Sequence, residues 1–379
     1  MEKKIEHETS TSSRAAVRAS LILSASLALA ACVPTVAKAD GGRNETQYQE
    51  INLVSDLAGI AQVQDTNLVN GWGISFHDTF PFWVSDNGTG RTTLYAVTND
   101  ASGSPHASTV PLVVTVPGGA PTGQVANNTT AFNGDIFLFV SEDGTVSGWR
   151  PDLRTAAEVL ARRANAVYKG VTLATMGSNT FLLAANFREA TLDVYDNATL
   201  VGQFSDRRAP AGYAPFNVQN LNGVIFVTFA KQDAARKDDV AGRGNGLIDT
   251  FSLSDGKFHR FAAGRAAGGN VRQMNSPWGL AIAPATFGTH ANQLLVGNFG
   301  SGTIMAFDAH GHFKGLLQGT GECPVEIPGL WGLTFGVNGG VSGVSTDLYF
   351  SAGPSDEQHG LFGVIQAVPG SADVNEERD

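Results

Sequence analysis

Cysteine is scarce in this sequence, which has two among 379 residues, Cys32 and Cys323. Small exported domains that cannot build a large core usually depend on several disulfides. If an N-terminal export signal is removed after Ala39, only Cys323 remains, and a disulfide framework is excluded. Cys323 is therefore interpreted as a structural residue rather than as a nucleophile.

Basic residues are also few, with 25 Lys and Arg against 35 Asp and Glu and a net charge of −10. Because contact with phosphates needs a basic surface, nucleic acid is excluded as a partner. Beyond the N-terminal region, no apolar run is long enough to cross a bilayer. The sequence also contains no Gly-x-Ser-x-Gly, no His-Glu-x-x-His and no cysteine and histidine zinc spacing.

Residues 1–39 have the composition of a signal peptide. Positive charge precedes an apolar stretch from Leu21 to Ala31, and Ala37-Lys38-Ala39 fits a small-residue cleavage site. Leu29-Ala30-Ala31-Cys32 also has the form of a lipoprotein box, so lipidation of Cys32 is the alternative. Either interpretation predicts an exported protein, periplasmic or extracellular, that reaches a membrane only through a lipid on Cys32.

A weak internal repeat runs through the rest of the chain. The six copies begin at steps of 50, 47, 47, 62 and 53 residues, near Trp72, Thr122, Lys169, Phe216, Trp278 and Trp331. Each copy contains short apolar runs separated by turn residues, and in the first copy strands are predicted at 72–76, 82–85, 93–97 and 112–116. Six four-stranded antiparallel units at this period predict an all-β fold, a six-bladed β-propeller.

The last repeat is one strand short. Strands are predicted at 331–335, 348–351 and 361–365, and an open fourth position would leave an unpaired edge. Ile51–Val54 has no partner in the first repeat, so we expect it to close the ring beside 361–365; an irregular arm is the alternative. The predicted parts are a signal peptide (1–39), a polar lead-in (40–50), the propeller (51–368) and a disordered acidic tail (369–379).

The fourth repeat carries an insertion at 231–246, where a hairpin needs only two to five residues. Its carboxylates are the oxygen ligands that calcium prefers. The candidate metal ligands are Asp233, Asp238 and Asp239, and the candidate ligand-binding residues at the start of the insertion are Lys231 and Gln232. The alternative is a solvated charged loop.

The corresponding loop of the last repeat contains Glu357 and His359, near the expected mouth of the channel. A carboxylate beside an imidazole is suited to general acid–base catalysis, and a surface ion pair is the alternative. Trp72, Trp278 and Trp331 lie at the channel end of three inner strands. They are candidate ligand-binding residues, as an apolar or carbohydrate-stacking platform, or else they pack between blades.

Several motifs extend across residues 51–365. They include Asn70-Gly71-Trp72-Gly73, Ser85-Asp86-Asn87, Ala230-Lys231-Gln232-Asp233 and Pro277-Trp278-Gly279-Leu280. Together they resemble a family of exported bacterial β-propellers with no settled biochemical role. The resemblance implies the same fold and an exported location, but no reaction.

More distantly, the fifth repeat is similar to the NHL repeat and to calcium-dependent lactonases of the gluconolactonase type. Those enzymes hold one calcium ion at the channel through Glu, Asn and Asp side chains. The resemblance implies that Asn217 is the counterpart of the Asn and a candidate ligand-binding residue, whereas the Glu and the Asp have no match here.

The sequence therefore supports two hypotheses about function. The first is a binding module that uses the loop face and the channel mouth for a small molecule or a cell-envelope protein. The alternative is a hydrolase or lyase that acts on a small ligand, with calcium as the cofactor that would assist it.

Overall fold

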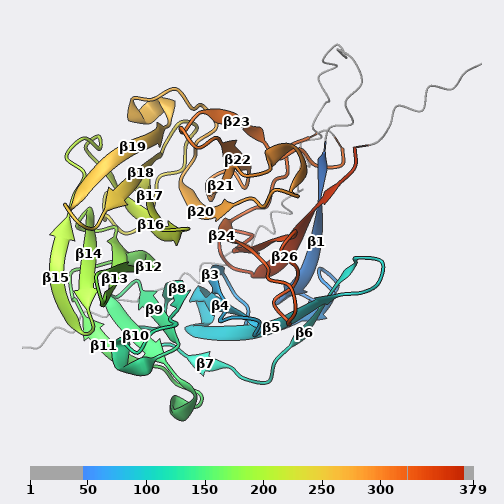
Figure 1. Cartoon of the computed structure of the whole chain (residues 1–379), viewed down its shortest axis with the longest axis horizontal. Coiled ribbons are helices and arrows are strands. Elements are labelled where there is room, and N and C mark those ends of the chain that lie inside the picture. Colours follow the sequence, from blue (N-terminus) through green and yellow to red (C-terminus); the bar gives the residue numbers. More distant parts are fainter. Residues whose placement is uncertain (1–45, 322, 371–379) are drawn as a thin grey trace, which may run out of the picture. The chain divides into compact units, whose positions relative to one another are not determined.

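The computed structural model describes residues 46–321 and 323–370. The predicted signal peptide, Cys32 and residues 371–379 of the predicted tail lie outside the described residues. The described chain forms six sheets arranged like blades around a central channel (Figure 1), which confirms the predicted six-bladed propeller. None of its helices is long and apolar enough to cross a membrane.

The blades follow one another along the chain, and each is listed from its inner strand outward. Blade 1 is β3 (Gly71–Ser75), β4 (Phe82–Asp86), β5 (Arg91–Asn99) and β6 (Pro105–Thr109), with β7 (Val114–Thr115) also on β5. Blade 2 is β8 (Pro121–Ala126), β9 (Phe137–Ser141), β10 (Thr145–Trp149) and β11 (Glu158–Arg162). Blade 3 is β12 (Tyr168–Met176), β13 (Asn179–Asn186), β14 (Thr191–Asp196) and β15 (Thr199–Phe204).

The second half repeats this order. Blade 4 is β16 (Tyr213–Leu221), β17 (Val224–Lys231), β18 (Leu247–Ser252) and β19 (Lys257–Ala263). Blade 5 is β20 (Pro277–Ile282), β21 (Leu294–Asn298), β22 (Ile304–Phe307) and β23 (Phe313–Leu316). Blade 6 is β24 (Leu330–Phe335), β25 (Leu348–Ala352), β26 (Leu361–Val368) and β1 (Gln47–Ser55), with the short β2 (Val63–Gln64) beside β1.

The outer strand of blade 1 lies elsewhere than predicted. It was expected at 112–116, but β6 pairs with β5 from Tyr95 to Asn99, and β7 covers only Arg91 and Thr92. β6 has one buried residue, Pro105. Because the rest of the strand faces solvent or is half-buried, it lacks the apolar run by which a strand is recognised.

The N-terminal strand closes the ring as predicted. β1 pairs antiparallel with β26, and the register sets Ile51 opposite Val364 and Val54 opposite Phe362. The strand begins at Gln47, so the end of the predicted lead-in belongs to the propeller. Leu53 and Val54 are fully buried, and they pack between blades 6 and 1.

Apolar side chains fill the space between blades. Six clusters of buried residues each lie between two neighbouring blades, and a seventh lies on the channel axis around Trp72, Trp278 and Trp331. Successive side chains along a strand point to opposite faces of the sheet. Each blade therefore has apolar residues on both faces and contributes to two clusters.

Ring closure can be tested by deletion. A variant without residues 40–55 loses the fourth strand of blade 6 and the burial of Leu53 and Val54, each worth about 1.5–3 kcal/mol. We expect its free energy of unfolding, measured in urea, to fall by roughly 3–6 kcal/mol. A variant without residues 40–45 alone retains β1 and should unfold like the parent. Equal stability of the two variants would contradict this role of β1.

Candidate functional site

All six inner strands carry a register irregularity at the same place, near their first residues. The irregularity turns one side chain of each strand inward, and these six residues, which we call the channel ring, are Trp72, Thr122, Lys169, Phe216, Trp278 and Trp331. All six are buried. The ring lies toward the upper face, defined here as the face that carries the loop between the second and third strand of each blade.

The tryptophans of the channel ring pack on one another. The rings of Trp72 and Trp331 stack with centroids 3.5 Å apart, and Trp278 meets both edge-on at 5.9 and 5.8 Å. Phe299 stacks on Trp331 at 3.9 Å. Because Trp331 lies between two rings and is 1% exposed, the geometry favours packing over a carbohydrate-stacking platform.

Lys169 is the only charged member of the channel ring, and its side chain is 2% exposed. Its ammonium group contacts the Glu142 carboxylate, lies 3.1 Å from Asp238 Oδ1 and sits 5.0 Å from the centre of the Trp72 ring. Burial opposes the charge, but the carboxylates of Glu142 and Asp238 outweigh it and raise the pKa of Lys169. The amine therefore stays protonated at neutral pH and is unsuited to act as a nucleophile.

Glu357 reaches the same site from blade 6. It ends a turn in which Ser355, Asp356 and Glu357 all have positive φ, a conformation that is costly for residues other than glycine. The carboxylate accepts a hydrogen bond of 2.5 Å from Asn70 Nδ2, and Asn70 Oδ1 accepts one of 3.0 Å from Trp331 Nε1. The strained turn and Asn70 thus hold the carboxylate near the axis.

Burial raises the pKa of Glu357, and the charges of Glu142 and Asp238 add to this effect, while Asn70 and Lys169 oppose it. Burial likewise raises the pKa of Asp239, against the nearby Ser276 and Lys169. Two carboxylates, of Glu142 and Asp238, therefore contact the buried ammonium group, and those of Asp239 and Glu357 lie near enough to interact with its charge; we call Lys169, Glu142, Asp238, Asp239 and Glu357 the acidic cluster.

Part of the cluster's polar surface has no partner. Among the described residues, Trp72 Nε1 is buried without a hydrogen bond, whereas Asp239 and Ser276 lie close enough to interact with each other. Buried polar atoms are normally paired, so the indole N–H of Trp72 leaves hydrogen-bonding capacity beside the acidic cluster.

The insertion of blade 4 folds back over this site. Gln232 and Asp239 form a backbone bridge, and Val240 N donates to Lys231 O at 2.7 Å, so the segment begins as a short hairpin. Its later part is tied to blade 5, where Gly242 N donates to Asn275 Oδ1 at 2.6 Å. The hairpin carries Asp238 from blade 4 to Lys169 on blade 3.

The other predicted site residues have separate partners. Asp233 Oδ1 accepts the backbone N–H of Lys237 at 2.8 Å within its own loop, and Lys231 is exposed. Gln232 donates to Phe187 O, and Asn217 Nδ2 donates to Trp278 O at 2.8 Å. His359 Nδ1 lies 2.8 Å from Asp56 Oδ2, so its described ring contact is with Asp56 and not with Glu357.

Within residues 46–321 and 323–370, no three His, Cys, Asp or Glu side chains are grouped so that they could hold a metal ion. Asp233, Asp238 and Asp239 are close in sequence but do not converge. Asp233 accepts a backbone N–H of its own loop, Asp238 pairs with Lys169, and Asp239 is half-buried. The geometry does not supply the set of oxygen ligands that calcium takes.

Sequence reasoning missed four residues of this region, Lys169, Glu142, Asn70 and Asp56. A usable signal existed for Lys169, because the other five repeats start with Trp, Thr or Phe at that position. A charged residue in a repeated position that is otherwise uncharged indicates a site. The partners of His359 and Glu357 had no such signal, because they are separated from these residues by 303 and 287 positions.

Comparison with known proteins identifies relatives by sequence and solved structures with a similar fold. No protein-family model matches the chain. Two uncharacterised proteins of Acanthamoeba polyphaga mimivirus are 29% and 28% identical over 344 and 346 residues. These matches cover 86% of this chain in each case, and 82% and 87% of the viral proteins. The relatives are viral, and membership of the exported bacterial family stays a prediction.

Among solved structures, the chain is similar to an auxiliary nutrient binding protein from Bacteroides thetaiotaomicron, with a TM-score of 0.53 and 10% identity over 85% of this chain and 77% of that one. It is also similar to an α-L-arabinanase of Penicillium chrysogenum complexed with arabinobiose, with a TM-score of 0.50 and 10% identity over 83% and 98% of the two chains. At this identity the likeness shows the propeller fold alone.

The acidic cluster makes stability depend on pH in a defined direction. Because the folded pKa of Glu357 is raised, its protonated form favours folding at low pH, and that contribution is lost as pH rises through the raised pKa. The Glu357→Gln variant keeps an acceptor for Asn70 and has no charge. We therefore expect its stability relative to the parent to increase as the pH rises from about 4, near the ordinary pKa of Glu, towards neutral pH.

The measurement is urea unfolding across that range. The control is Glu326→Gln, which removes the same charge from an exposed position. If the free energy of unfolding of the two variants, relative to the parent, depends on pH in the same way, then burial at this site does not destabilise the charged form of Glu357.

Proposed function

We propose that this protein is a ligand-binding module whose upper face recognises a cationic group, either a small amine or a basic side chain of a cell-envelope protein. The observation that carries the proposal is the excess of carboxylates around Lys169. Four acidic side chains share the site with Lys169 and with Lys237, whose ammonium lies 3.5 Å from Glu142 Oε2. A bound cation would relieve the repulsion among these carboxylates.

Access to the cluster supports this proposal. The Asp238 side chain is 58% exposed, the Glu142 side chain is 14% exposed and Glu357 is half-buried. A ligand that approaches the upper face therefore meets carboxylates before it meets the buried ammonium of Lys169. Because the four carboxylates outnumber Lys169 and Lys237, an anion would meet net repulsion there, whereas a cation gains charge-assisted hydrogen bonds.

The hydrolase or lyase alternative has weaker support. It requires Glu357 and His359 to act together, but the described contacts of the two side chains lead to Asn70 and Asp56. Glu357 retains the raised pKa of a general acid. Calcium assistance would require ligands beyond the carboxylates that the described residues bring together.

Binding of an amine tests the proposal. We expect isothermal titration at low ionic strength to detect putrescine binding, because salt screens exposed charges. Asp238→Asn should weaken the affinity about tenfold, since a hydrogen bond to a charged group is worth about 1.5–3 kcal/mol. Raising the salt concentration should weaken binding to the parent as well.

The matched control is Asp308→Asn, which makes the same change at a half-buried residue whose contacts are with His310 and His312 in its own loop. If both variants lose the same affinity for putrescine, the loss comes from the change in net charge and not from the acidic cluster. Absence of putrescine binding to the parent would contradict the cationic ligand.

We further propose that the protein is exported, as its N-terminal region and its resemblance to exported bacterial propellers suggest. Intact-mass measurement of the native protein should find a terminus at Asp40 or, in the alternative, a lipidated Cys32. A mass shift that disappears in Cys32→Ser would select the lipoprotein. A native protein that retains Met1 and the following residues would contradict export by either route.

A further inference from the structure

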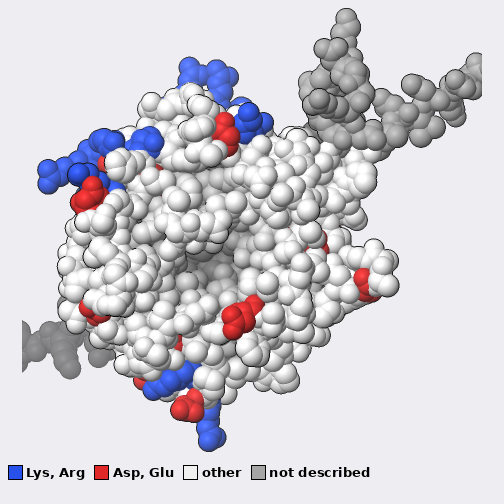
Figure 2. Space-filling model, viewed as in Figure 1, with Lys and Arg blue, Asp and Glu red and all other residues white. Residues whose placement is uncertain are grey.

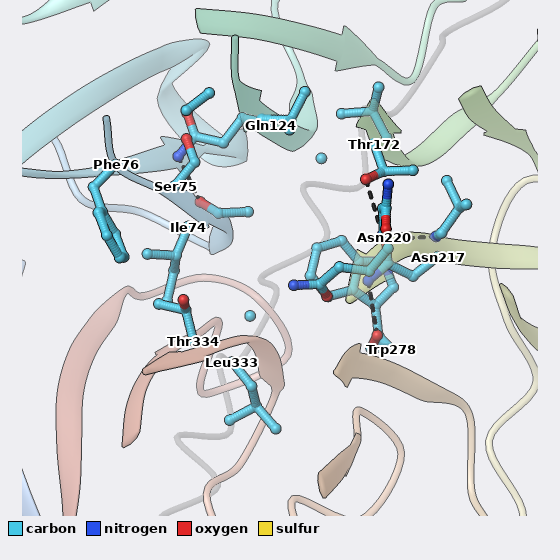
Figure 3. A pocket seen from close by; sticks show the side chains of 18 residues that line it. Ile74, Ser75, Phe76, Gln124, Thr172, Asn217, Asn220, Trp278, Leu333 and Thr334 are labelled. Carbon is cyan, nitrogen blue, oxygen red and sulfur yellow. Dashed lines mark hydrogen bonds between the residues drawn. The ribbon is translucent and has the colours of Figure 1, made fainter. Parts of the chain in front are cut away.

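The central channel contains a second chamber, separate from the acidic cluster. It encloses about 250 Å³ and is lined by residues of all six inner blade strands and their ends. Figure 3 shows Ile74, Ser75 and Phe76 on one side of the chamber and Thr172 and Asn220 on the other. In Figure 2 the molecule is hollowed at the middle of the ring, and the charged side chains in view lie outside the hollow.

The chamber lies at the opposite end of the channel from the acidic cluster. Its lining comes from the later residues of the inner strands, such as Ser75, Asn220 and Thr334, whereas the channel ring lies at their beginnings. Trp278 belongs to both, and the stacked rings of Trp72 and Trp331 pack against it. The tryptophans therefore separate the two ends.

No side chain that lines the chamber is ionisable. A charged ligand would lose its hydration there without gaining a counterion, which is costly. This property excludes the cation proposed for the upper face and equally excludes anions. The chamber therefore selects a neutral ligand.

The wall nevertheless has unused hydrogen-bonding groups. Ser75 Oγ is buried without a partner, and no hydrogen bond is described for the Gln219 side chain. Thr172 Oγ1 accepts the backbone N–H of Asn220 at 3.0 Å, which leaves its own hydrogen to donate. Other amides are occupied, since Gln124 Nε2 donates to Gly73 O at 2.9 Å.

The main chain adds further groups. Each inner strand ends its sheet and has a strand partner on one side only, so the edge that faces the channel carries backbone N–H and C=O groups outside the ladder. Three of these carbonyls, Gly73 O, Leu173 O and Trp278 O, accept side-chain hydrogen bonds. Between these polar groups lie the apolar surfaces of Ile74, Phe76 and Leu333. The wall thus offers donors, acceptors and apolar patches at close intervals.

We propose that this lower chamber binds a neutral polyhydroxylated molecule of monosaccharide or polyol size. Such a molecule has hydroxyl groups that both donate and accept, and C–H faces that pack on apolar side chains. The chamber volume lies just below the roughly 300–1,000 Å³ of typical ligand pockets, which fits a small ligand. The polar and apolar elements of the wall match this chemistry without any counterion.

Saturation-transfer NMR of the full propeller tests the proposal. The panel is glucose, galactose and xylitol, with glucuronate and glucosamine as charged relatives of the same ring. We expect at least one neutral compound to bind, with an affinity at least tenfold higher than that of its charged relatives.

The test variant is Gln219→Leu, which removes the free amide and should weaken that affinity about tenfold. Gln358→Leu makes the same change at an exposed residue in the upper loop of blade 6 and should leave it unchanged. Ser75→Ala is a second, smaller change in the chamber and should also weaken binding. Near-parent circular dichroism and melting temperature verify that the variants fold.

The two binding sites can fail separately. Asp238→Asn should retain binding of the neutral compound, and Gln219→Leu should retain binding of putrescine. The proposal for the lower chamber is overturned if no neutral compound of the panel binds, if charged relatives bind equally well, or if Gln219→Leu and Ser75→Ala both bind like the parent.

Discussion

Close approach of backbones at the channel is the constraint on which the rest of this structure depends. In five blades the residue after the channel-ring position is a glycine. A Cβ atom would come within 2.7 Å of a neighbouring atom at Gly73 and Gly332, 2.6 Å at Gly123, 2.5 Å at Gly279 and 2.1 Å at Gly170. Real Cβ atoms do not approach so closely, so glycine lets each inner strand contact the next. Blade 4 has Asn217 instead, and its amide bonds to Trp278 O.

This crowding determines the chemistry of the upper site. Because the inner strands pack so tightly, the six channel-ring side chains share one narrow layer, and large aromatic rings fill most of it. Lys169 enters the same layer and loses its hydration, so it requires carboxylates close by. Glu142 comes from the short loop of blade 2, whereas Asp238 reaches Lys169 only because blade 4 has its insertion. The insertion therefore supplies one of the two carboxylates that contact this buried cation.

The fold was predictable because it repeats, and the site was less so because it does not. The spacing of the repeats and the missing fourth strand of the last blade predicted the ring and its closure by β1. β6 was missed, since one buried residue gives no pattern. Glu357 and Asp238 were identified as candidates from their loops, but Asn70 and Glu142 look like ordinary turn residues. Their role depends on which loops meet above the axis, and no local pattern in the sequence contains that information.

The aromatic stack has a further consequence for how the channel can work. A propeller channel that is open from end to end would give both mouths the same solvent and the same ligands. Here Trp72, Trp278 and Trp331 are at most 4% exposed and contact one another. Above them the polar groups are charged, and in the chamber below them the lining is neutral. One end of the channel therefore presents charged groups and the other only neutral ones, and the aromatic stack between them keeps the two environments distinct.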